Sequence, residues 1–471
     1  MLEFDQNQSA IANNPWWRTG AIDDRFRRLS PRPFIADLEA LLQSGNDSSV
    51  LPTLVVGPSG AGKTVLLHQF IQKLLSRGVS PGRVVKISLD IPCHINGDLG
   101  EIAKGYVAAA NNDGAGGYFI ILDGVHVLDD WEEQIKNLAT TNPDWRIIAS
   151  SIMAPRFSGN QTAGRDVEKA SGGYFSSIIL PPVTFAEFIQ FQNLKSKIFD
   201  AYGKLHDSEA LNSAFTDYLA WGGFTDAVMG LGPQRVDMAE ITSQSIMRGS
   251  PGVYGVGDVG ELSRLYAHLV HGLATSYSIE TLAKEFAIAK NTIRKYLDYL
   301  EAAFLIRRVW RIDGQAKKFA RQTQFKVYLI NPSHRVALFG PSKISDPISA
   351  RMAENAVISQ FVHSKSLSRL FYAEWKSGNS NRHVSLVEMP EKGTRPVKCI
   401  EIDWSDRALA LPQKILADMT AFMDQTNPQT PSKVLTRTIP GKRFVGEHEI
   451  GFLPVAVWCW AVGKPLAERI G

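Results

Sequence analysis

Apolar and polar positions follow two different periodicities along residues 51–180. Short runs of apolar, β-branched residues recur between longer stretches whose apolar residues are spaced as on one face of a helix, for example residues 65–75. The short runs indicate buried strands at residues 54–56, 84–90, 118–122 and 146–149. Strands that alternate with helices predict a parallel sheet with helices on both faces. Such a sheet binds its ligands at the carboxyl ends of its strands.

Helical patterns flank this α/β region on both sides. They indicate amphipathic helices at residues 34–42, 185–191 and 211–219. We therefore expect an N-terminal arm over residues 1–50, an α/β core over 51–180, and a small helical lid over 181–275. The arm contains two adjacent tryptophans, Trp16 and Trp17, and we expect them to pack against the core rather than to stack on a nucleotide base.

Residues 276–340 carry a second informative pattern. It indicates a short helix at 279–286, a tight connection, a longer helix at 290–303 and a strand at 304–310. Ile293, Leu297 and Leu300 lie on one face of the longer helix, which predicts its buried side. The order helix, turn, helix, strand is typical of a winged helix-turn-helix.

The remaining residues, 341–471, show a mixed pattern. Strands are indicated at residues 371–375, 383–387, 397–404 and 433–436, and helices at residues 353–362 and 409–422. We therefore expect a C-terminal domain of mixed α and β type.

Length and composition narrow the class of protein. A chain of 471 residues predicts about three domains of roughly 150 residues each. The formal charge of +4 is too small to predict a nucleic-acid partner without knowing where the charge lies. Cys93, Cys399 and Cys459 form no C-x-x-C pair, which excludes a zinc ribbon and predicts a reduced, cytoplasmic protein. The chain starts without a signal-peptide pattern, and its longest apolar run is too short to predict a membrane segment.

Candidate chemistry is clearest directly after the first strand. The residues there spell G-x-x-x-x-G-K-T, a phosphate-binding loop placed between a strand and a helix. Glycines allow backbone N–H groups to close around a phosphate, and the positive end of the next helix points at the same oxygens. This predicts binding of ATP with Mg²⁺. The predicted nucleotide-binding residues are Gly57, Pro58, Ser59, Gly60, Ala61, Gly62, Lys63, Thr64 and Val65.

Polar side chains at the ends of later strands complete the predicted site. Lys63 would reach the β- and γ-phosphates, while Thr64 and Asp123 would hold Mg²⁺. Ser150 ends the fourth strand, where it would contact the γ-phosphate or the attacking water; a structural turn is the alternative. ATPases of this class commonly place a glutamate directly after the aspartate, but this chain has Gly124. The sequence therefore predicts slow hydrolysis, or hydrolysis stimulated by DNA or a partner; the alternative is ATP binding without hydrolysis.

Two arginines are further candidates for contact with the nucleotide. Arg165 lies in a glycine-rich, polar segment, and Arg248 precedes Gly-Ser-Pro. Either side chain would sense the phosphates if its segment folded over the site. The alternative for each is a solvated surface arginine.

A basic stretch overlaps the predicted winged helix. Residues 290–321 contain nine basic and three acidic residues, the kind of local excess that binds duplex DNA. The alternative is a module that only packs against a partner protein. The predicted DNA-binding residues are Lys290, Asn291, Thr292, Arg294, Lys295, Arg307 and Arg308.

The C-terminal strands carry only part of the pattern of a two-metal nuclease. That site needs a carboxylate on one strand and E-x-K on the next. The corresponding positions here are Ser385, Glu401 and Asp403, so a carboxylate and the lysine are missing and only Glu401, with Glu354, remains. We expect a nuclease-like domain without nuclease activity.

Taken in order, these motifs resemble a family of prokaryotic AAA-type ATPases with a winged helix and a restriction-endonuclease-like, PD-(D/E)xK-type domain. The resemblance runs through N-P-W-W at Asn14, the phosphate loop, P-P-V-T-F-A-E-F at Pro181, W-G-G-F at Trp221 and C-I-E-I-D-W at Cys399. It implies an AAA-type parallel-sheet core with a helical lid, a winged helix over residues 276–340, and a degenerate nuclease-like α/β domain over residues 341–471. It also implies ATP and Mg²⁺ as ligands.

The sequence therefore predicts an ATP-binding, DNA-associated switch or loader. The resemblance to AAA-type ATPases also implies a homo-oligomer. The first alternative is an ATP-stabilised scaffold that binds a partner protein without binding DNA. The second is an ATP-dependent nuclease that uses Glu401.

Overall fold

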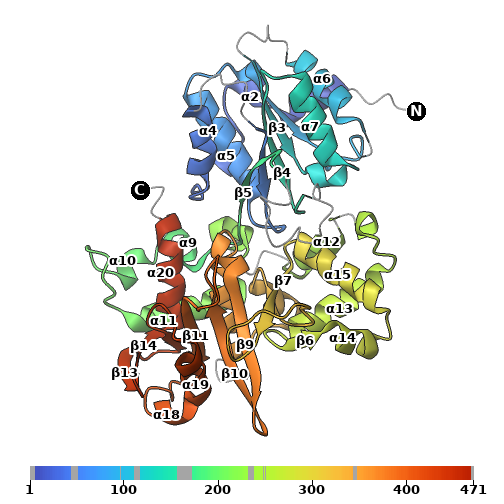
Figure 1. Ribbon diagram of the computed structural model, residues 1–471. Coiled ribbons are helices and arrows are strands. Elements are labelled where there is room, and N and C mark those ends of the chain that lie inside the picture. Colours follow the sequence, from blue (N-terminus) through green and yellow to red (C-terminus); the bar gives the residue numbers. More distant parts are fainter. Residues whose placement is uncertain are drawn as a thin grey trace.

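The computed structural model describes residues 6–43, 51–95, 97–110, 117–155, 172–231, 238–247, 249, 251–342 and 347–467. Two sheets organise these residues. A five-stranded sheet lies in the upper body of Figure 1, and a nine-stranded sheet lies in the lower body.

The five-stranded sheet is parallel throughout and has the order β2-β3-β4-β1-β5. The first four strands confirm the runs predicted from the sequence. The polar start of β5 hid that strand, which lies along β1. The bounds are β1 Thr53–Val56, β2 Val84–Ser88, β3 Phe119–Asp123, β4 Arg146–Ser151 and β5 Ser176–Ile179.

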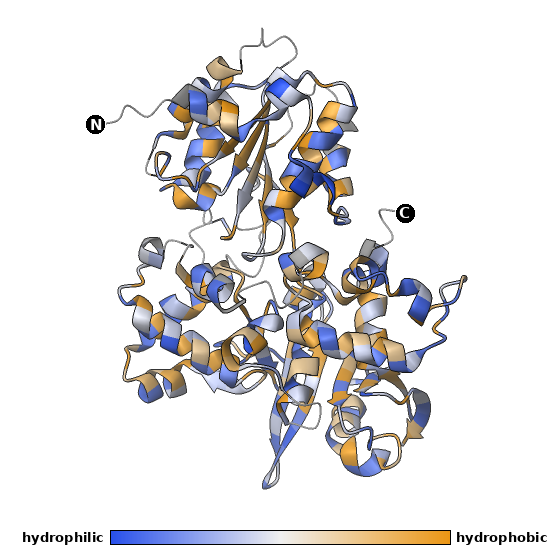
Figure 2. Cartoon of the chain, turned by 180° about the vertical axis from the view of Figure 1, so that it is seen from behind, coloured by the Kyte–Doolittle hydropathy of each residue, from blue (hydrophilic) through white to orange (hydrophobic). Residues whose placement is uncertain are grey.

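Helices cover both faces of this sheet, as predicted. Alternation along β1 shows why: Val55 packs with α4 and α5 on one face, while Leu54 and Val56 pack with α6 and α7 on the other. The strands are mostly apolar, whereas the covering helices carry both hydrophilic and hydrophobic residues, as Figure 2 shows. The helices are α4 Ile35–Gln43, α5 Lys63–Ser76, α6 Leu99–Ala109 and α7 Trp131–Thr141, with 3₁₀ turns at Pro81–Arg83 and Val125–Val127.

The N-terminal arm covers the free edge of β2. The indole nitrogens of Trp16 and Trp17 each donate a hydrogen bond of 2.9 Å to the Val84 carbonyl. The Asn14 side chain pairs with the backbone N–H and C=O of Lys86. Side chains thus satisfy backbone groups that an edge strand would otherwise expose, and the predicted packing role of the tryptophans is confirmed. The arm contains α1 Gln6–Asn13, α2 Trp16–Thr19 and α3 Asp24–Arg27.

The segment after β5 is helical, as expected for the lid. It packs against the C-terminal helix α20, where the rings of Phe199 and Trp460 stack 4.2 Å apart. Its elements are α9 Phe185–Phe191, α10 Lys195–Ile198, α11 Ser208–Trp221, a π-helical turn Ala227–Leu231, α12 Met238–Met247, a 3₁₀ turn Pro251–Tyr254 and α13 Val259–His271.

The nine-stranded sheet has the order β13-β14-β12-β11-β10-β9-β7-β8-β6. Its strands are β6 Ser276–Ser278, β7 Ile306–Ile312, β8 Gln324–Leu329, β9 Leu370–Ser377, β10 Ser380–Glu388, β11 Lys398–Asp403, β12 Lys433–Thr436, β13 Gly441–Val445 and β14 His448–Pro454. The helices in this region are α14 Ile279–Phe286, α15 Lys290–Ala302, α16 Ser333–Phe339, α17 Pro347–Ser359, a 3₁₀ turn Lys365–Arg369, α18 Pro412–Ile415, α19 Ala417–Thr426 and α20 Val455–Ala467.

One strand pair joins two regions that the sequence analysis placed in separate domains. Strand β7 runs parallel to β9, with Trp310 opposite Phe371 and Ile312 opposite Ala373. The predicted boundary between residues 340 and 341 therefore divides a continuous sheet. Of the helices described, none is both long and apolar enough to cross a membrane.

A buried ion pair ties the arm to the lid. Arg32 and Glu187 are 2% and 0% exposed, and two parallel hydrogen bonds of 2.8 Å join the guanidinium to the carboxylate. Arg32 also donates to the carbonyls of Ala61 and Pro181 at 2.7 Å, while Glu187 accepts hydrogen bonds from Thr184 at the start of α9. Every polar group in this cluster therefore has a partner, as a buried charge requires.

We expect Glu187→Gln to lower the free energy of unfolding by about 3–5 kcal/mol, because it leaves the buried Arg32 guanidinium without a counter-charge. Chemical denaturation would measure the loss. The matched control is Arg25→Ala, since Arg25 is paired with Asp23 on an exposed surface, and it should cost at most about 1 kcal/mol. Equal stability of Glu187→Gln and wild type would contradict this account.

Candidate functional site

The predicted nucleotide-binding residues meet at the carboxyl end of the five-stranded sheet. The loop from Gly57 to Thr64 leaves β1, Asp123 ends β3, and Ser150 lies near the end of β4. Strands β3 and β4 pair so that Asp123 is opposite Ser150. The Thr64 hydroxyl lies 3.3 Å from one oxygen of Asp123. The structure thus brings together residues from three separate parts of the chain.

The loop has the backbone shape that its glycines predict. Gly60 and Gly62 have φ of 74° and 84°, in the left-handed region that favours glycine. A Cβ on Gly57 would lie 2.0 Å from the Leu180 carbonyl oxygen, so only glycine fits there. Gly62 precedes α5 and supplies no side-chain cap, so the N–H groups of the first turn, at Lys63, Thr64 and Val65, face the loop. This arrangement suits the binding of a phosphate group.

Lys63 is folded back onto the loop that it belongs to. Its ammonium donates to the carbonyls of Gly57 and Pro58 at 2.8 and 2.7 Å. Burial lowers the pKa of Lys63 to about 7, and the nearby Asp123 carboxylate opposes that shift only in part. A negatively charged ligand would stabilise the ammonium form, so the residue is suited to binding phosphate.

Asp123 is held as a carboxylate by its neighbours. Burial alone would raise its pKa, but Lys86 and hydrogen bonds from Ser150 and Thr64 outweigh that effect, so the pKa of Asp123 is lowered. The Ser150 hydroxyl donates to Asp123 at 2.7 Å and accepts the N–H of Gly124 at 3.0 Å. Ser150 therefore fixes the orientation of Asp123. The sequence had left open a contact with the γ-phosphate or water and a structural turn, and this role differs from both.

Lys86 is a site residue that the sequence analysis missed. Its ammonium lies 3.4 Å from the second oxygen of Asp123 and donates to the Ser88 hydroxyl at 2.7 Å. Only 4% of Lys86 is exposed. A lysine in the middle of a predicted strand was the available signal, because a charged residue inside an apolar run needs a buried partner.

Two residues hold the phosphate loop through its carbonyl oxygens. Arg32 donates to Ala61 at 2.7 Å, and the Thr225 N–H donates to Gly60 at 3.2 Å. The Thr225 methyl group also lies 3.0 Å from where a Cβ on Gly62 would be. These contacts use carbonyl oxygens of the loop; among its N–H groups, those of Gly57 and Ala61 are bonded within the protein, to the Ser151 and Pro58 carbonyls.

Thr225 belongs to a turn in the lid, residues 222–225, which we call the lid turn. The lid turn also contacts the segment that follows β8. The Gly223 N–H donates to the Ser333 hydroxyl at 3.1 Å. A Cβ on Gly223 would lie 2.0 Å from the Asn331 side-chain oxygen, so the approach requires glycine. The turn at residues 222–225 is thus in contact with the phosphate loop and with the β8–α16 junction.

Arg165 and Arg248, the predicted nucleotide-sensing arginines, lie outside the described residues. They stay predictions from the sequence.

The predicted DNA-binding residues fall into two groups. On α15 the side chains of Lys290, Asn291, Arg294 and Lys295 are exposed, and Thr292 is partly exposed. Lys290 pairs with Glu280 at 2.7 Å across an exposed surface, a contact worth little. The exposed face of α15 is therefore basic, as the sequence predicted.

Arg307 and Arg308 do not belong to that face, which corrects the predicted set. Each is 4% exposed, because β7 lies inside the nine-stranded sheet rather than at its edge. Arg308 forms ion pairs with Glu301 and Asp298 on the inner side of α15. The exposed cations near this strand are instead Lys317, Lys318 and Arg321, between β7 and β8.

The C-terminal carboxylates are bound within the protein. Ser385 donates its N–H to Glu401 at 3.1 Å and its hydroxyl to the same carboxylate, while burial raises the pKa of Glu401. Glu354 pairs with Lys326 at 3.0 Å. Asp403 accepts N–H groups of the following loop. In the parts of the chain that the structure describes, no group of three or more His, Cys, Asp or Glu could hold a metal ion.

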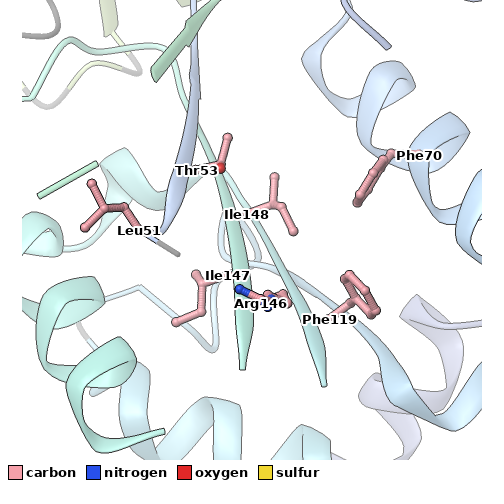
Figure 3. Close-up of a pocket in the computed structure, with 7 residues that line it drawn as sticks. All are labelled: Leu51, Thr53, Phe70, Phe119, Arg146, Ile147 and Ile148. Carbon is pink, nitrogen blue, oxygen red and sulfur yellow. The ribbon is translucent and has the colours of Figure 1, made fainter. Parts of the chain in front are cut away.

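A small pocket lies at the opposite end of the five-stranded sheet (Figure 3). It is lined by residues where β1, β3 and β4 begin, together with Phe70 of α5. Most of its lining is apolar, and it lies far from the carboxyl ends where Thr64, Asp123 and Ser150 meet. We therefore assign it no part in the site.

We expect Lys86→Met to lower the free energy of unfolding by about 3–5 kcal/mol, because it leaves the largely desolvated Asp123 carboxylate, whose side chain is 12% exposed, without its buried ion-pair partner. Urea denaturation of the nucleotide-free protein would measure it. Lys73→Met is the control, since Lys73 pairs with Glu39 and is 47% exposed. A loss no larger than that of the control would show that Lys86 does not balance Asp123.

Comparison with known proteins places the first part of the chain. Residues 50–189 match an AAA domain, and residues 212–345 match a domain of unknown function, DUF8612. An uncharacterized protein of Haemophilus influenzae is 23% identical over 286 residues, which are 59% of this chain and 66% of that protein. This chain thus covers just under two thirds of the relative's length.

Solved structures with a similar arrangement are distant. The Walker-type ATPase PABY2304 of Pyrococcus abyssi is 12% identical with a TM-score of 0.37, over 66% of this chain and 99% of that one. AMPPCP-bound DnaA from Aquifex aeolicus is 17% identical with a TM-score of 0.28, over 58% and 89%. Residues 50–189 are therefore similar to an AAA domain, and the parallel sheet order and the phosphate loop support a P-loop ATPase-like fold for this part of the chain.

Proposed function

We propose that this chain is an ATP-dependent switch that acts on duplex DNA. The observation that carries the proposal is the lid turn at residues 222–225. It is hydrogen-bonded to the phosphate loop through Thr225 and to the β8–α16 junction through Gly223. A change in the loop on nucleotide binding would therefore reach β8, which pairs with the strand that follows α15. Ligand-dependent loops are an established means of such coupling.

The site residues fit ATP with Mg²⁺. The N–H groups before and within the first turn of α5 suit the phosphates, and the Lys63 ammonium would leave its two carbonyl partners to bind them. Thr64 and Asp123 already lie within 3.3 Å of each other and would hold the metal ion between them. When bound, the ion would neutralise phosphate charge. Without the ion, the Lys86 ammonium stabilises the Asp123 carboxylate.

The DNA-binding part of the proposal depends on α15 and the loop after β7. We assign β6, α14, α15, β7 and β8 as a winged helix in which α15 enters the major groove. Support comes from the exposed basic residues of α15 and from Lys317, Lys318 and Arg321. Arg307 and Arg308 serve instead as buried structural residues of the sheet.

The burial of Arg307 and Arg308 also favours a second candidate, an ATP-stabilised scaffold that binds a partner protein. Burial removes two cations from the predicted DNA surface. In that case the C-terminal region, a nuclease-like fold whose carboxylates are bound internally, would serve as the platform. For either candidate we retain a homo-oligomer as the working form of the protein.

We expect binding of ATP with Mg²⁺ at pH 8 to take up close to one proton. Burial holds the pKa of Lys63 at about 7 without ligand, so the side chain is mostly neutral at pH 8. Phosphate raises that pKa, and the protein gains about one proton on binding. Titration calorimetry in buffers of different ionisation enthalpy measures the uptake. It should fall toward zero at pH 6, where Lys63 is already charged. Uptake that persists in Lys63→Met would assign the proton to another group.

We expect Arg294→Glu with Lys295→Glu to weaken duplex DNA binding about tenfold or more at fixed salt, and to reduce the salt dependence. Fluorescence anisotropy with and without ATP and Mg²⁺ measures both effects. Lys442→Glu with Arg443→Glu is the matched control, because both side chains are exposed on β13. Unchanged DNA binding in the α15 variant would favour the scaffold.

The same assay tests the coupling. Ser333→Ala removes the acceptor of the Gly223 N–H. It should leave DNA affinity without ATP unchanged but reduce the effect of ATP. DNA affinity that is equal with and without ATP in the wild type would rule out the switch.

A further inference from the structure

The backbone at residue 124 disfavours the glutamate that ATPases of this class commonly carry there. Gly124 has φ of 86° and precedes the 3₁₀ turn Val125–Val127. Its N–H donates to the carbonyl and hydroxyl oxygens of Ser150 at 3.2 and 3.0 Å. Any side chain at this position would be strained, because residues other than glycine rarely adopt this conformation. Because residue 124 is glycine, a carboxylate that takes a proton from the attacking water must lie on another element.

Asp90 lies beside this position. Strand β2 runs parallel to β3, with Ser88 opposite Asp123, and the Leu89 N–H donates to the Asp123 carbonyl at 2.9 Å. The next residue, Asp90, is therefore placed alongside Gly124. A Cβ built on Gly124 would lie 3.8 Å from the Asp90 Cβ. The Asp90 side chain thus starts next to the point from which a glutamate at residue 124 would start.

Asp90 is also free to act. Its side chain is exposed at the carboxyl end of the sheet. Its nearest competitor is His126, whose Cε1 lies 3.8 Å from the same Cβ position. Asp129 and Asp130 follow beyond the 3₁₀ turn, and Asp130 is the N-cap residue directly before α7. A general base must lie within hydrogen-bond reach of the proton that it accepts, and the Asp90 side chain starts beside the position where ATPases of this class commonly carry their glutamate.

We propose that Asp90 is the catalytic carboxylate of this ATPase, acting from β2 in place of a side chain at residue 124. The inference rests on the proposed binding of ATP. Asp90 accepts a proton from the attacking water as the water oxygen bonds to the γ-phosphorus. The bond between that phosphorus and the β–γ bridging oxygen breaks, and ADP keeps the electron pair. The proton then passes from Asp90 to the released phosphate.

The test measures MgATP affinity and ATP turnover separately, on the full chain, for wild type, Asp90→Asn, Asp90→Glu, His126→Asn and Asp129→Asn. We expect Asp90→Asn to bind MgATP within about twofold of wild type but to lose about 10²–10⁴-fold in turnover, the usual contribution of a general base. Asp90→Glu should recover part of the rate. Asp129→Asn, the matched control, should not change it.

Three results would overturn the proposal: wild-type turnover in Asp90→Asn, loss of turnover in His126→Asn alone, or a wild type that binds MgATP tightly without hydrolysing it. The last result would leave the nucleotide-dependent switch intact. Absence of MgATP binding by the wild type would instead refute the proposed function itself, so the two failures are distinguishable. Melting temperatures of all variants would show whether a lost rate comes from misfolding.

Discussion

The nucleotide site depends on the hydrogen bonds that the Arg32 guanidinium donates. Arg32 lies in the N-terminal arm, yet its partners are a lid carboxylate, a carbonyl of the phosphate loop and a carbonyl beyond β5. A planar group with five donors can serve all of these at once, which a lysine could not. The arm is therefore part of the ATPase core in a physical sense, since a buried charge holds the loop, the arm and the lid at fixed separations.

The parts of the site that could be predicted from sequence are those set by local geometry. The loop from Gly57 to Thr64 is one contiguous motif, and Asp123 and Ser150 follow from the rule that parallel strands end at one edge. Lys86 and Thr225 could not be found in this way. Their roles depend on which segments become neighbours, and β2 next to β3, or the lid turn next to Gly60, leaves no periodic signal in the sequence.

The error at Arg307 and Arg308 has the same origin. A wing strand at the edge of a small domain would expose alternate side chains, but β7 has a neighbour on both sides because β9 pairs with it over Trp310 to Ile312. The basic pattern was correct, whereas the solvent exposure was not. The acids on the inner side of α15, the buried Glu301 and the partly buried Asp298, were the available indication that one arginine would turn inward.

The shared sheet also determines how any movement would be transmitted. Because β7 and β9 are hydrogen-bonded neighbours, β7, which follows α15, cannot move apart from the strand that begins at Leu370 without breaking the ladder. A displacement at the lid turn would therefore move β8, β7 and β9 together. The hairpin of β9 and β10 projects farthest from the ATPase core in Figure 1. In a rigid rotation about the lid turn, displacement grows with distance from the axis, so the hairpin tip would move farther than the strands near the turn.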